Sequence, residues 1–290
     1  MSRKIYQLPG FNGVAPGAVG AVSSLATGSQ VYDSIGLKIT KNGALVTLAN
    51  LATDIKEIRI VADSRPIRRI TPALLLCYLQ SKGLMPSLTN AAGADVLSAF
   101  IPFTDPTRPE VLGQESTALG TADVKELQVQ LDFQDPGGAP VYAASGVAQV
   151  RTAAKSIRFI ETWQIESFTT VNGIVTLNTL TTTDDYLGLI LPQSTITRVK
   201  VTRDSGDPDF DAFKGDIEAL LRSYGRGAQI TAGYFPVPFD VTGQVTDALA
   251  MSARDSKGDV IARVNKLNVE ITATAAATFN FLRRNLWIGN

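Results

Sequence analysis

The sequence predicts an all-β protein built from two tandem jelly-roll β-sandwiches, each carrying one short helix. Valine, isoleucine and threonine are frequent in this chain of 290 residues, and their branched side chains suit the pleated surface of a sheet. Short alternating runs are separated by long polar connections with glycine and proline, which is typical of a sandwich. The same order of elements also occurs twice along the chain.

Two strand patterns are repeated. Residues 125–131, KELQVQL, alternate apolar side chains with glutamines, and residues 265–271, NKLNVEI, have the same alternation. Residues 55–63, IKEIRIVAD, and residues 196–204, ITRVKVTRD, form an earlier pair. Apolar residues at every second position predict strands with one buried face and one solvated face.

A helix follows the early strand of the first half, in residues 70–83, ITPALLLCYLQSKG. Thr71 suits the N-cap, Pro72 the first helical position and Gly83 the position just beyond the end. The only cysteine, Cys77, lies in this apolar run, and we expect it to be a small buried hydrophobe.

A second helix is predicted within residues 210–227, because apolar side chains recur there at the spacing of one helical stripe. The stripe consists of Ile217, Leu220, Leu221 and Tyr224. At a constant spacing along the chain, its last three members align with Leu74, Leu75 and Tyr78 of the first helix.

A strand marked by proline follows each helix: residues 100–105, FIPFTD, and residues 235–240, FPVPFD. Near the start of each half, IGLKI (35–39) and LGLIL (187–191) form a further, shorter pair. Matches that occur in the same order along the chain indicate a duplicated module. Each half is also long enough for a jelly roll of eight strands. The pattern by itself also fits two immunoglobulin-like or other sandwiches, and the helix in the middle of each half favours the jelly roll.

The two modules are expected at residues 1–150 and 151–290. Residues 143–156 follow a strong turn signal and are poor in large apolar side chains, so they should hold the boundary. Residues 10–28 are rich in glycine and alanine, and we interpret them as an N-terminal arm outside the core. The second module is expected to end in a C-terminal tail.

Composition argues against several classes of function. The 27 basic and 27 acidic residues cancel, so no overall field should attract nucleic acid or an acidic membrane. Histidine, the commonest general base and metal ligand, is absent from the sequence. Without a phosphate loop, nucleophile elbow or spaced acid pair, no enzyme is expected. No run of 18 apolar residues is present, so we expect no membrane span and a chain that is soluble when made.

The sharpest polar cluster is DSGDPDFDAFKGDIE, residues 204–218. Asp207, Asp209 and Asp211 alternate, and Glu218 follows at the spacing of the last ligand of a calcium loop. Ala212 stands where such a loop requires glycine. Two interpretations remain open: calcium binding by the three aspartates, or capping of the helix by Asp209 or Asp211.

Two basic clusters suggest contacts. They are Arg65, Arg68 and Arg69 in the first half, and Arg283, Arg284 and Trp287 near the end. We interpret the first as structural, pairing with an acidic loop of a neighbouring copy or subunit rather than with phosphate or lipid headgroups. The second has the composition of a segment after the last strand that docks on a partner, on a membrane surface or on its own domain.

A duplicated sandwich without catalytic motifs suits a structural building block. Three copies around an axis would present six similar modules, and such nearly hexagonal tiles can cover a shell. The alternative is a tandem carbohydrate-binding or adhesin-like module, although two tryptophans and seven tyrosines offer few aromatic platforms. A carboxylate-dependent amidase or glycosidase is a third possibility, and the spacing of the acids does not favour it. These acids are Glu161, Glu166, Asp184 and Asp185.

Several pieces of the sequence together resemble a known family. IKEIRIVADSRPI, the helix after it, KELQVQL and the ending VNKLNVEITATAAATFNFLRRNLW resemble the major capsid protein of tailless, membrane-containing icosahedral bacteriophages. The corticovirus and finnlakevirus types, with their small double jelly rolls, are nearest in size. The resemblance covers nearly the whole chain.

This resemblance implies a homotrimeric, pseudo-hexagonal capsomer in the icosahedral shell of a virion, with strands roughly normal to the shell above an internal lipid membrane. The implied partners are further copies of the chain, neighbouring capsomers, and penton or membrane proteins, without sequence-specific nucleic acid binding. Before assembly the chain would be soluble in the host cytoplasm. Capsids of the corticovirus type are associated with calcium, which bears on Asp207, Asp209 and Asp211.

Overall fold

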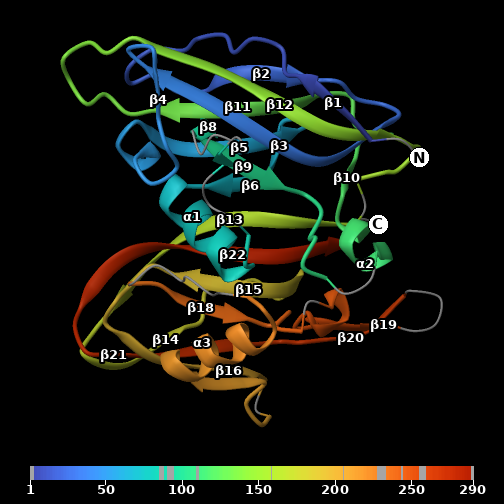
Figure 1. The fold of residues 1–290 in the computed structure, drawn as a ribbon. Helices are drawn as coiled ribbons and strands as arrows, with labels where there is room; N and C mark the ends of the chain where they lie inside the picture. Colours follow the sequence, from blue (N-terminus) through green and yellow to red (C-terminus); the bar gives the residue numbers. More distant parts are fainter. Residues whose placement is uncertain are drawn as a thin grey trace.

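Two β-sandwiches lie one above the other in the computed structural model (Figure 1). The structure describes residues 3–84, 88–89, 95–108, 111–157, 159–204, 206–226, 233–242, 244–254 and 259–288. Strands dominate both halves and helices are few, which confirms the all-β prediction.

The first sandwich consists of two sheets. One contains β1 (Arg3–Gln7), β12 (Tyr142–Thr152), β3 (Gln30–Lys41), β9 (Ala99–Pro102), β10 (Leu119–Gly120) and β4 (Ala44–Leu45). The other runs in the order β6 (Arg65–Ile70), β5 (Ile55–Ala62), β11 (Leu127–Phe133) and β2 (Ala21–Leu25).

The second sandwich repeats this arrangement. One sheet has the order β13 (Phe159–Thr170), β22 (Ala277–Ile288), β15 (Asp185–Leu191) and β18 (Phe235–Pro238). The other has the order β17 (Phe210–Phe213), β16 (Ile196–Arg203), β21 (Leu267–Ala273) and β14 (Gly173–Leu177). In these orders, β1, β12, β3 and β9 of the first module correspond to β13, β22, β15 and β18 of the second. In the other sheets, β6, β5, β11 and β2 correspond to β17, β16, β21 and β14. The predicted duplication is therefore confirmed. The small hairpins β7 (Leu88–Thr89) with β8 (Asp95–Leu97) and β19 (Ser252–Arg254) with β20 (Val260–Arg263) complete the strands.

The two sandwiches share one sheet. β6 of the first module pairs in parallel with β13 of the second at Arg68 and Trp163. This contact joins two four-stranded sheets edge to edge into a single eight-stranded sheet. The buried apolar residues form two hydrophobic cores. The core of the first module also includes Ile160, Trp163, Ile190 and Leu282 of the second module, so it continues across the shared sheet.

A shared irregularity shows that the modules correspond residue by residue. Tyr32 of β3 and Tyr186 of β15 are both fully buried, and each donates a 2.7 Å hydrogen bond from its hydroxyl group to a carbonyl just before the strand. One bulged residue follows each tyrosine, Asp33 or Leu187, where the pairing with β12 or β22 slips. Identical bulges at identical places fix the alignment of the strands.

The twin strands of the two modules are held by the same device. Asp63 directly follows β5 and has a φ of 47°, and Asp204 directly follows β16 and has a φ of 52°. Aspartate tolerates this conformation better than most residues. The Oδ1 atom of Asp63 accepts hydrogen bonds of 2.9 Å from the two amides that precede β11. Asp204 accepts bonds of 2.9 and 3.0 Å from the two amides that precede β21.

Helix α1 (Pro72–Ser81) begins and ends where its capping residues predict. The side chain of Thr71 accepts a hydrogen bond from the amide of Leu74 at 3.3 Å, and Gly83 adopts the left-handed conformation with a φ of 70°. Cys77 is fully buried, and burial raises the pKa of its thiol far above the usual value, as expected for a packing residue. The first module also contains a second short helix, α2 (Val111–Ser116), so the prediction of one helix per module is wrong there.

Helix α3 (Lys214–Ser223) confirms the second predicted helix but not the whole stripe. Ile217 and Leu221 are buried, whereas Leu220 and Tyr224 are 45% and 50% exposed. The stripe is therefore only partly covered by the core of its own module.

The predicted alignment of the two helices is wrong by one turn. Both helices have ten residues, and both are followed by a left-handed glycine, Gly83 or Gly225. Aligned by these ends, Tyr78 corresponds to Leu220 and Lys82 to Tyr224. The sequence alignment failed because leucines and tyrosines recur at one-turn intervals in both helices.

Two predicted peripheral segments are strands instead. β2 lies within residues 10–28 and pairs with β11, so the prediction of an arm outside the core is wrong for Ala21–Leu25. Its small side chains Ala21 and Ser23 are 1% exposed, because burial here comes from pairing rather than from large apolar groups. β22 is a central strand between β13 and β15, so the segment predicted as a C-terminal tail is part of the sheet.

The connection between the modules lies close to the predicted boundary. β12 pairs with β1 and β3 and continues to Thr152, and β13 starts at Phe159. The boundary at residue 150 stays a prediction. No helix in the described part of the chain has the length and apolar character needed to cross a bilayer.

We expect Asp204→Ala to destabilise the second module by about 1–2 kcal/mol, because it leaves two backbone amides without their acceptor. Urea unfolding monitored by circular dichroism measures the change. Asp204→Asn, which keeps an acceptor oxygen and tolerates a positive φ, should lose clearly less. Equal stability of the alanine variant and the wild type would contradict the assigned role.

Candidate functional site at the module junction

Eight charged side chains are buried in and around the region where the two modules meet, and each is at most 3% exposed. They are Arg68, Lys82, Asp105 and Arg108 of the first module, and Glu161, Arg226, Asp240 and Arg284 of the second. Charged side chains are almost never fully buried unless they are paired. This concentration marks the junction as the most specialised part of the fold.

Lys82 connects the two modules directly. It follows α1, and its Nζ atom donates hydrogen bonds to Oδ2 of Asp105 at 2.8 Å and to Oδ2 of Asp240 at 2.6 Å. Asp105 lies just after β9 and Asp240 just after β18, which are equivalent strands. One lysine therefore binds a carboxylate from each module.

Arg284 extends the network across the second module. From the middle of β22, its Nε atom donates to Oε1 of Glu161 at 2.7 Å and its Nη2 atom to Oδ2 of Asp240 at 3.0 Å. The indole nitrogen of Trp163 also donates to Oε1 of Glu161, at 2.9 Å. Asp240 is therefore shared between Lys82 and Arg284.

Trp163 is the largest side chain buried in this junction. The guanidinium of Arg68 lies 4.1 Å from the centre of the Trp163 ring and 4.5 Å from that of Phe103. The ring of Tyr78 lies 4.7 Å from that of Trp163. Arg68 also donates to the carbonyl oxygens of Glu161 and Pro102, at 3.0 and 2.5 Å. The second module thus inserts one aromatic side chain against β6 and α1 of the first.

The ends of α1 and α3 also meet here. Gly83 has a φ of +70°, and a Cβ atom added to it would lie 2.9 Å from the carbonyl oxygen of Gly225, so only glycine suits this position. Arg226 donates to the carbonyl oxygen of Asp240 at 2.9 Å and to the hydroxyl of Thr107 at 3.0 Å. Backbone and side-chain contacts therefore both cross the junction.

The electrostatics keep the three buried carboxylates ionised. Burial alone would raise the pKa of Asp240, but Arg284 and Lys82 hold it well below its usual range. The pKa of Asp105 is likewise lowered against burial by Lys82 and Arg108, and that of Glu161 mainly by Arg284. Burial lowers the pKa of Arg68 to about 10, so this side chain stays charged at neutral pH.

This arrangement fixes the relative position of the two modules, and its carboxylates are paired with lysine and arginine side chains. Breaking a buried ion pair is costly because the remaining charge has no partner, whereas the intact pair specifies one relative position of its elements. Among the acids that a hydrolase would need, Glu161 binds Arg284, Glu166 lies 2.8 Å from Arg283, and Asp185 accepts the amide of Met251.

Lys82, Asp105 and Asp240 are functional residues that sequence reasoning missed. The sequence shows an aspartate shortly after each of the paired strands, in FIPFTD and FPVPFD, although Asp240 corresponds to Thr104 and Asp105 to Val241. The lysine at the end of an apolar helix gave no such signal, since its partners lie 23 and 158 residues away.

Arg65, Arg68 and Arg69 have structural contacts within this chain, which differ from the expected pairing with a neighbouring copy or subunit. Arg68 lies in the junction, Arg65 stacks at 4.8 Å on Trp287, and Arg69 donates to Glu57 at 2.8 and 2.9 Å. Because Glu57 lies on the adjacent strand β5, the expected acidic loop of another copy or subunit is wrong for Arg69. Of the C-terminal cluster, Arg284 and Trp287 pack within this chain.

The carboxylates of the candidate calcium cluster bind arginines. Asp211 accepts two hydrogen bonds from Arg198, at 2.7 and 2.5 Å. Asp209 accepts from the Nε atom of Arg203 at 3.0 Å. The expectation that either aspartate caps α3 is wrong, because the N-cap is Phe213 and both carboxylates bind guanidinium groups before the helix starts.

These carboxylates do not form a ready cation cage, because guanidinium groups already occupy two of them. Within the described ranges, no group of three or more histidine, cysteine or acidic side chains could hold a metal ion. Calcium binding by Asp207, Asp209 and Asp211 stays a prediction.

Two equivalent jelly rolls joined by a buried junction place this chain in the class of double jelly-roll proteins. The family model described as the viral coat protein P2 N-terminal domain matches residues 5–151. The chain belongs to this family, and it is a viral coat protein. No curated protein sequence gives a match.

Solved structures agree with the fold. The major capsid protein P2 from bacteriophage PM2 has a TM-score of 0.79 and 18% identity, covering 100% of this chain and 98% of that chain. The corresponding protein of Sulfolobus Turreted Icosahedral Virus has a TM-score of 0.64 and 10% identity, covering 99% and 97%. VP54 of PBCV-1 has a TM-score of 0.59 and 10% identity, covering 98% and 93%. The prediction of a double jelly-roll capsid protein is confirmed, and the carbohydrate-binding alternative is not favoured.

Asp240→Asn should destabilise the protein by about 3–5 kcal/mol, because it leaves Lys82 and Arg284 buried with one negative charge fewer. Asp211→Asn is the matched control, since its ion pair with Arg198 is solvated and should contribute little to stability. Chemical denaturation of both variants compares them. Similar losses would show that the junction has no special role.

The junction also predicts a loss of stability in acid. Because Asp105, Asp240 and Glu161 have lowered pKa values in the folded state, they bind protons more weakly there than in the unfolded chain. Their contribution is complete above the usual values of 3.8 and 4.5 and is lost as pH falls further. Urea unfolding at pH 7, 5 and about 3 should show this decline, and Asp240→Asn should flatten it. A flat wild-type profile would contradict this account.

Proposed function

We propose that the chain is the major capsid protein of an icosahedral virus and that its building block is a homotrimer with a pseudo-hexagonal outline. One observation carries the proposal. Two equivalent modules are held in one relative position by a buried network of Lys82, Asp105, Asp240, Arg284 and Glu161. A rigid pair of similar modules, repeated three times around an axis, forms a tile with six similar corners.

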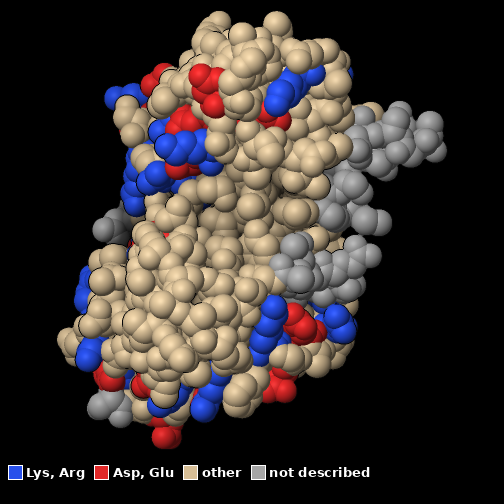
Figure 2. All heavy atoms as spheres, turned by 90° about the vertical axis from the view of Figure 1, so that its left-hand side faces the viewer, with Lys and Arg blue, Asp and Glu red and all other residues tan. Residues whose placement is uncertain are grey.

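The course of the strands supports an orientation in the shell. The strands of both modules run across the molecule, so their ends gather at two opposite faces (Figure 1). Figure 2 shows one of these faces, with a broad area free of charged side chains over the lower module. We propose that the strands stand roughly normal to the shell and that these two faces are its outer and inner surfaces.

The proposal includes the partners of a shell protein. They are further copies of this chain, neighbouring capsomers, penton or membrane proteins, and an internal lipid membrane, without sequence-specific nucleic acid binding. The location is the virion, preceded by a soluble state in the host cytoplasm. Support comes from family membership and from the balance of 27 basic and 27 acidic residues.

The proposed role is mechanical and not enzymatic. The described carboxylates of the junction form ion pairs with Lys82 and Arg284. They are therefore not a pair of free acids in a substrate cavity. A carbohydrate platform also lacks support, because the two tryptophans are engaged elsewhere. Trp163 is fully buried in the junction, and Trp287 stacks with Arg65.

Purified protein should form a trimer. Size-exclusion chromatography with multi-angle light scattering is expected to give about three times the chain mass of 30.9 kDa. The trimer should persist on dilution, because a mechanical tile requires a stable interface. A strictly monomeric protein at high concentration would overturn the capsomer proposal.

A further inference from the structure

The module junction has an unfilled counterpart on the second module. In the junction, Trp163 packs against Arg68 and Tyr78, and Arg68 packs in turn on Phe103. Because the modules correspond residue by residue, the three residues of this receiving surface have counterparts on β17, α3 and the end of β18.

Three alignments identify these counterparts. Phe210 corresponds to Arg68. Phe210 pairs with Val201 on β16, and Arg68 pairs with Ile60 at the equivalent place on β5. Leu220 corresponds to Tyr78 when the helices are aligned by their ends. The amide of Phe239 donates to the bulged residue of β15, as the amide of Phe103 donates to that of β3.

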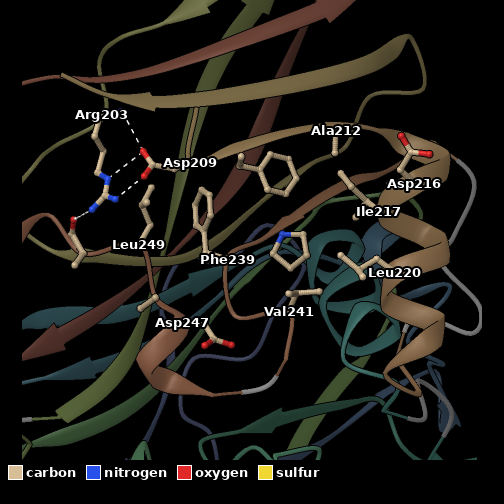
Figure 3. A pocket seen from close by; sticks show the side chains of 14 residues that line it. Arg203, Asp209, Ala212, Asp216, Ile217, Leu220, Phe239, Val241, Asp247 and Leu249 are labelled. Atoms are coloured by element: carbon tan, nitrogen blue, oxygen red, sulfur yellow. Dashed lines mark hydrogen bonds and ion pairs between the residues drawn. The ribbon is translucent and has the colours of Figure 1, made fainter. Parts of the chain in front are cut away.

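These three counterparts line one groove of about 480 Å³. The rings of Phe210 and Phe239 contact each other edge to face, with 6.0 Å between their centres. Leu220 is 45% exposed. Figure 3 shows Leu220, Phe239 and Val241 directed toward the same open space between α3 and the chain after β18. The surface that receives Trp163 in the first module is therefore repeated in the second without an occupant among the described residues.

The same alignment identifies the counterpart of Trp163. Trp163 on β13 pairs with Arg284 on β22. Arg284 lies directly next to the bulge, because Arg284 pairs with Gly188 and the next residue, Asn285, pairs with Tyr186. On β1, Ile5 pairs with Gln149, which has the same position relative to the slip between β12 and β3. Ile5 is 76% exposed, whereas Trp163 is buried.

The strands that carry these residues lie at sheet ends. β6 and β13 would each end a four-stranded sheet, but they pair with each other. Their counterparts β17 and β1 end their sheets without a further neighbouring strand in the described chain. Unpaired strand edges are natural sites for contact with another chain.

We propose that Ile5 on β1 of a second copy of this chain enters the groove between Phe210, Leu220 and Phe239. The contact would repeat, between two copies, the contact that Trp163 makes within one copy. It is heterologous, and a heterologous contact forms a closed ring when the rotation between neighbouring copies is a whole fraction of a turn, which for the proposed capsomer is one third. This inference rests on the proposed capsomer function and names the contact that holds the capsomer together.

Charge distribution supports the same pairing. β1 carries Lys4, whereas Arg3 beside it already pairs with Asp33 and Glu115 of its own chain. The groove is bordered by Asp216 and Asp247, so Lys4 is the charge of β1 that suits them. Opposite charges on two approaching surfaces favour their encounter and orientation more than their final affinity. Association should therefore slow at high salt, whereas the apolar contact of Ile5 should determine how long the complex lasts.

Two substitutions test the contact from its two sides. Ile5→Asp and Leu220→Asp each place a charge in an apolar contact and should weaken association about tenfold or more. Ile174→Asp is the matched control, because Ile174 is 68% exposed on β14, away from the groove. Light scattering over a dilution series should show dissociation of the first two variants and a trimer for the control. Thermal melting checks that all three are folded.

A cross-link tests proximity without disrupting the contact. Ile5→Cys combined with Leu220→Cys should be joined by a short bis-maleimide into chains of three on a denaturing gel. The native Cys77 is buried and should not react. The two single variants, co-expressed so that they assemble into mixed trimers, should give only linked pairs, and each single variant alone should give none.

The outcomes separate this inference from the proposed function. A wild-type trimer that survives Ile5→Asp and is not cross-linked would overturn the Ile5 contact and leave the capsomer proposal standing. A wild-type protein that stays monomeric would overturn both. Cross-linked chains of three, together with dissociation of both aspartate variants, would establish the contact.

Discussion

The ionic network around Lys82 is the interaction on which the relative position of the modules depends. Its Nζ atom lies 2.8 and 2.6 Å from carboxylates of the two modules, and Arg284 ties one of these carboxylates to the centre of β22. In a buried site such charges tolerate little displacement, because each shift leaves a charge without its partner. The parallel pairing of β6 with β13 and the packing of Trp163 add backbone and apolar contacts in the same place. The junction therefore acts as one rigid unit and not as a flexible linker.

The comparison of the junction with the groove shows how one surface serves two purposes. Lys82 corresponds to Tyr224 when the helices are aligned by their ends, and Asp105 corresponds to Val241 after the equivalent strands. At these two positions the junction, which is buried within the chain, has charged residues. On the open surface of the second module, the corresponding positions have an aromatic and an apolar residue. A buried charge network requires exact partners, which a covalent chain supplies. An apolar surface can be exposed to water before assembly and buried afterwards. If the two surfaces fit imperfectly, burying apolar groups costs less free energy than burying charges without partners.

Much of the fold could be predicted because local patterns reflect burial directly. The alternation in KELQVQL and NKLNVEI appears as Leu127, Val129, Leu267 and Val269, all buried, and the caps of α1 lie where Thr71 and Gly83 stand. The failures share a cause. Leu220 has the spacing of a core residue, yet its side of α3 faces the groove and not the core, and spacing cannot tell these apart. β22 contains Arg283, Arg284 and Trp287, whose composition suggests a docking segment after the last strand until their partners on other strands are known.

Alternation of side chains, capping residues and the repeated order of motifs by themselves predicted two β-sandwich modules, because alternation and caps act over a few residues. Which strands pair within each module, and hence the jelly-roll topology, was decided by the tertiary structure. The tertiary structure alone decided what the charged residues do. Glu161 and Arg284 are 123 residues apart in the chain, and only strand pairing brings them to 2.7 Å. The identical bulges after Tyr32 and Tyr186 likewise exist only in paired strands, and they are what align Ile5 with Trp163. Local preference sets the elements, whereas long-range pairing sets which surfaces meet.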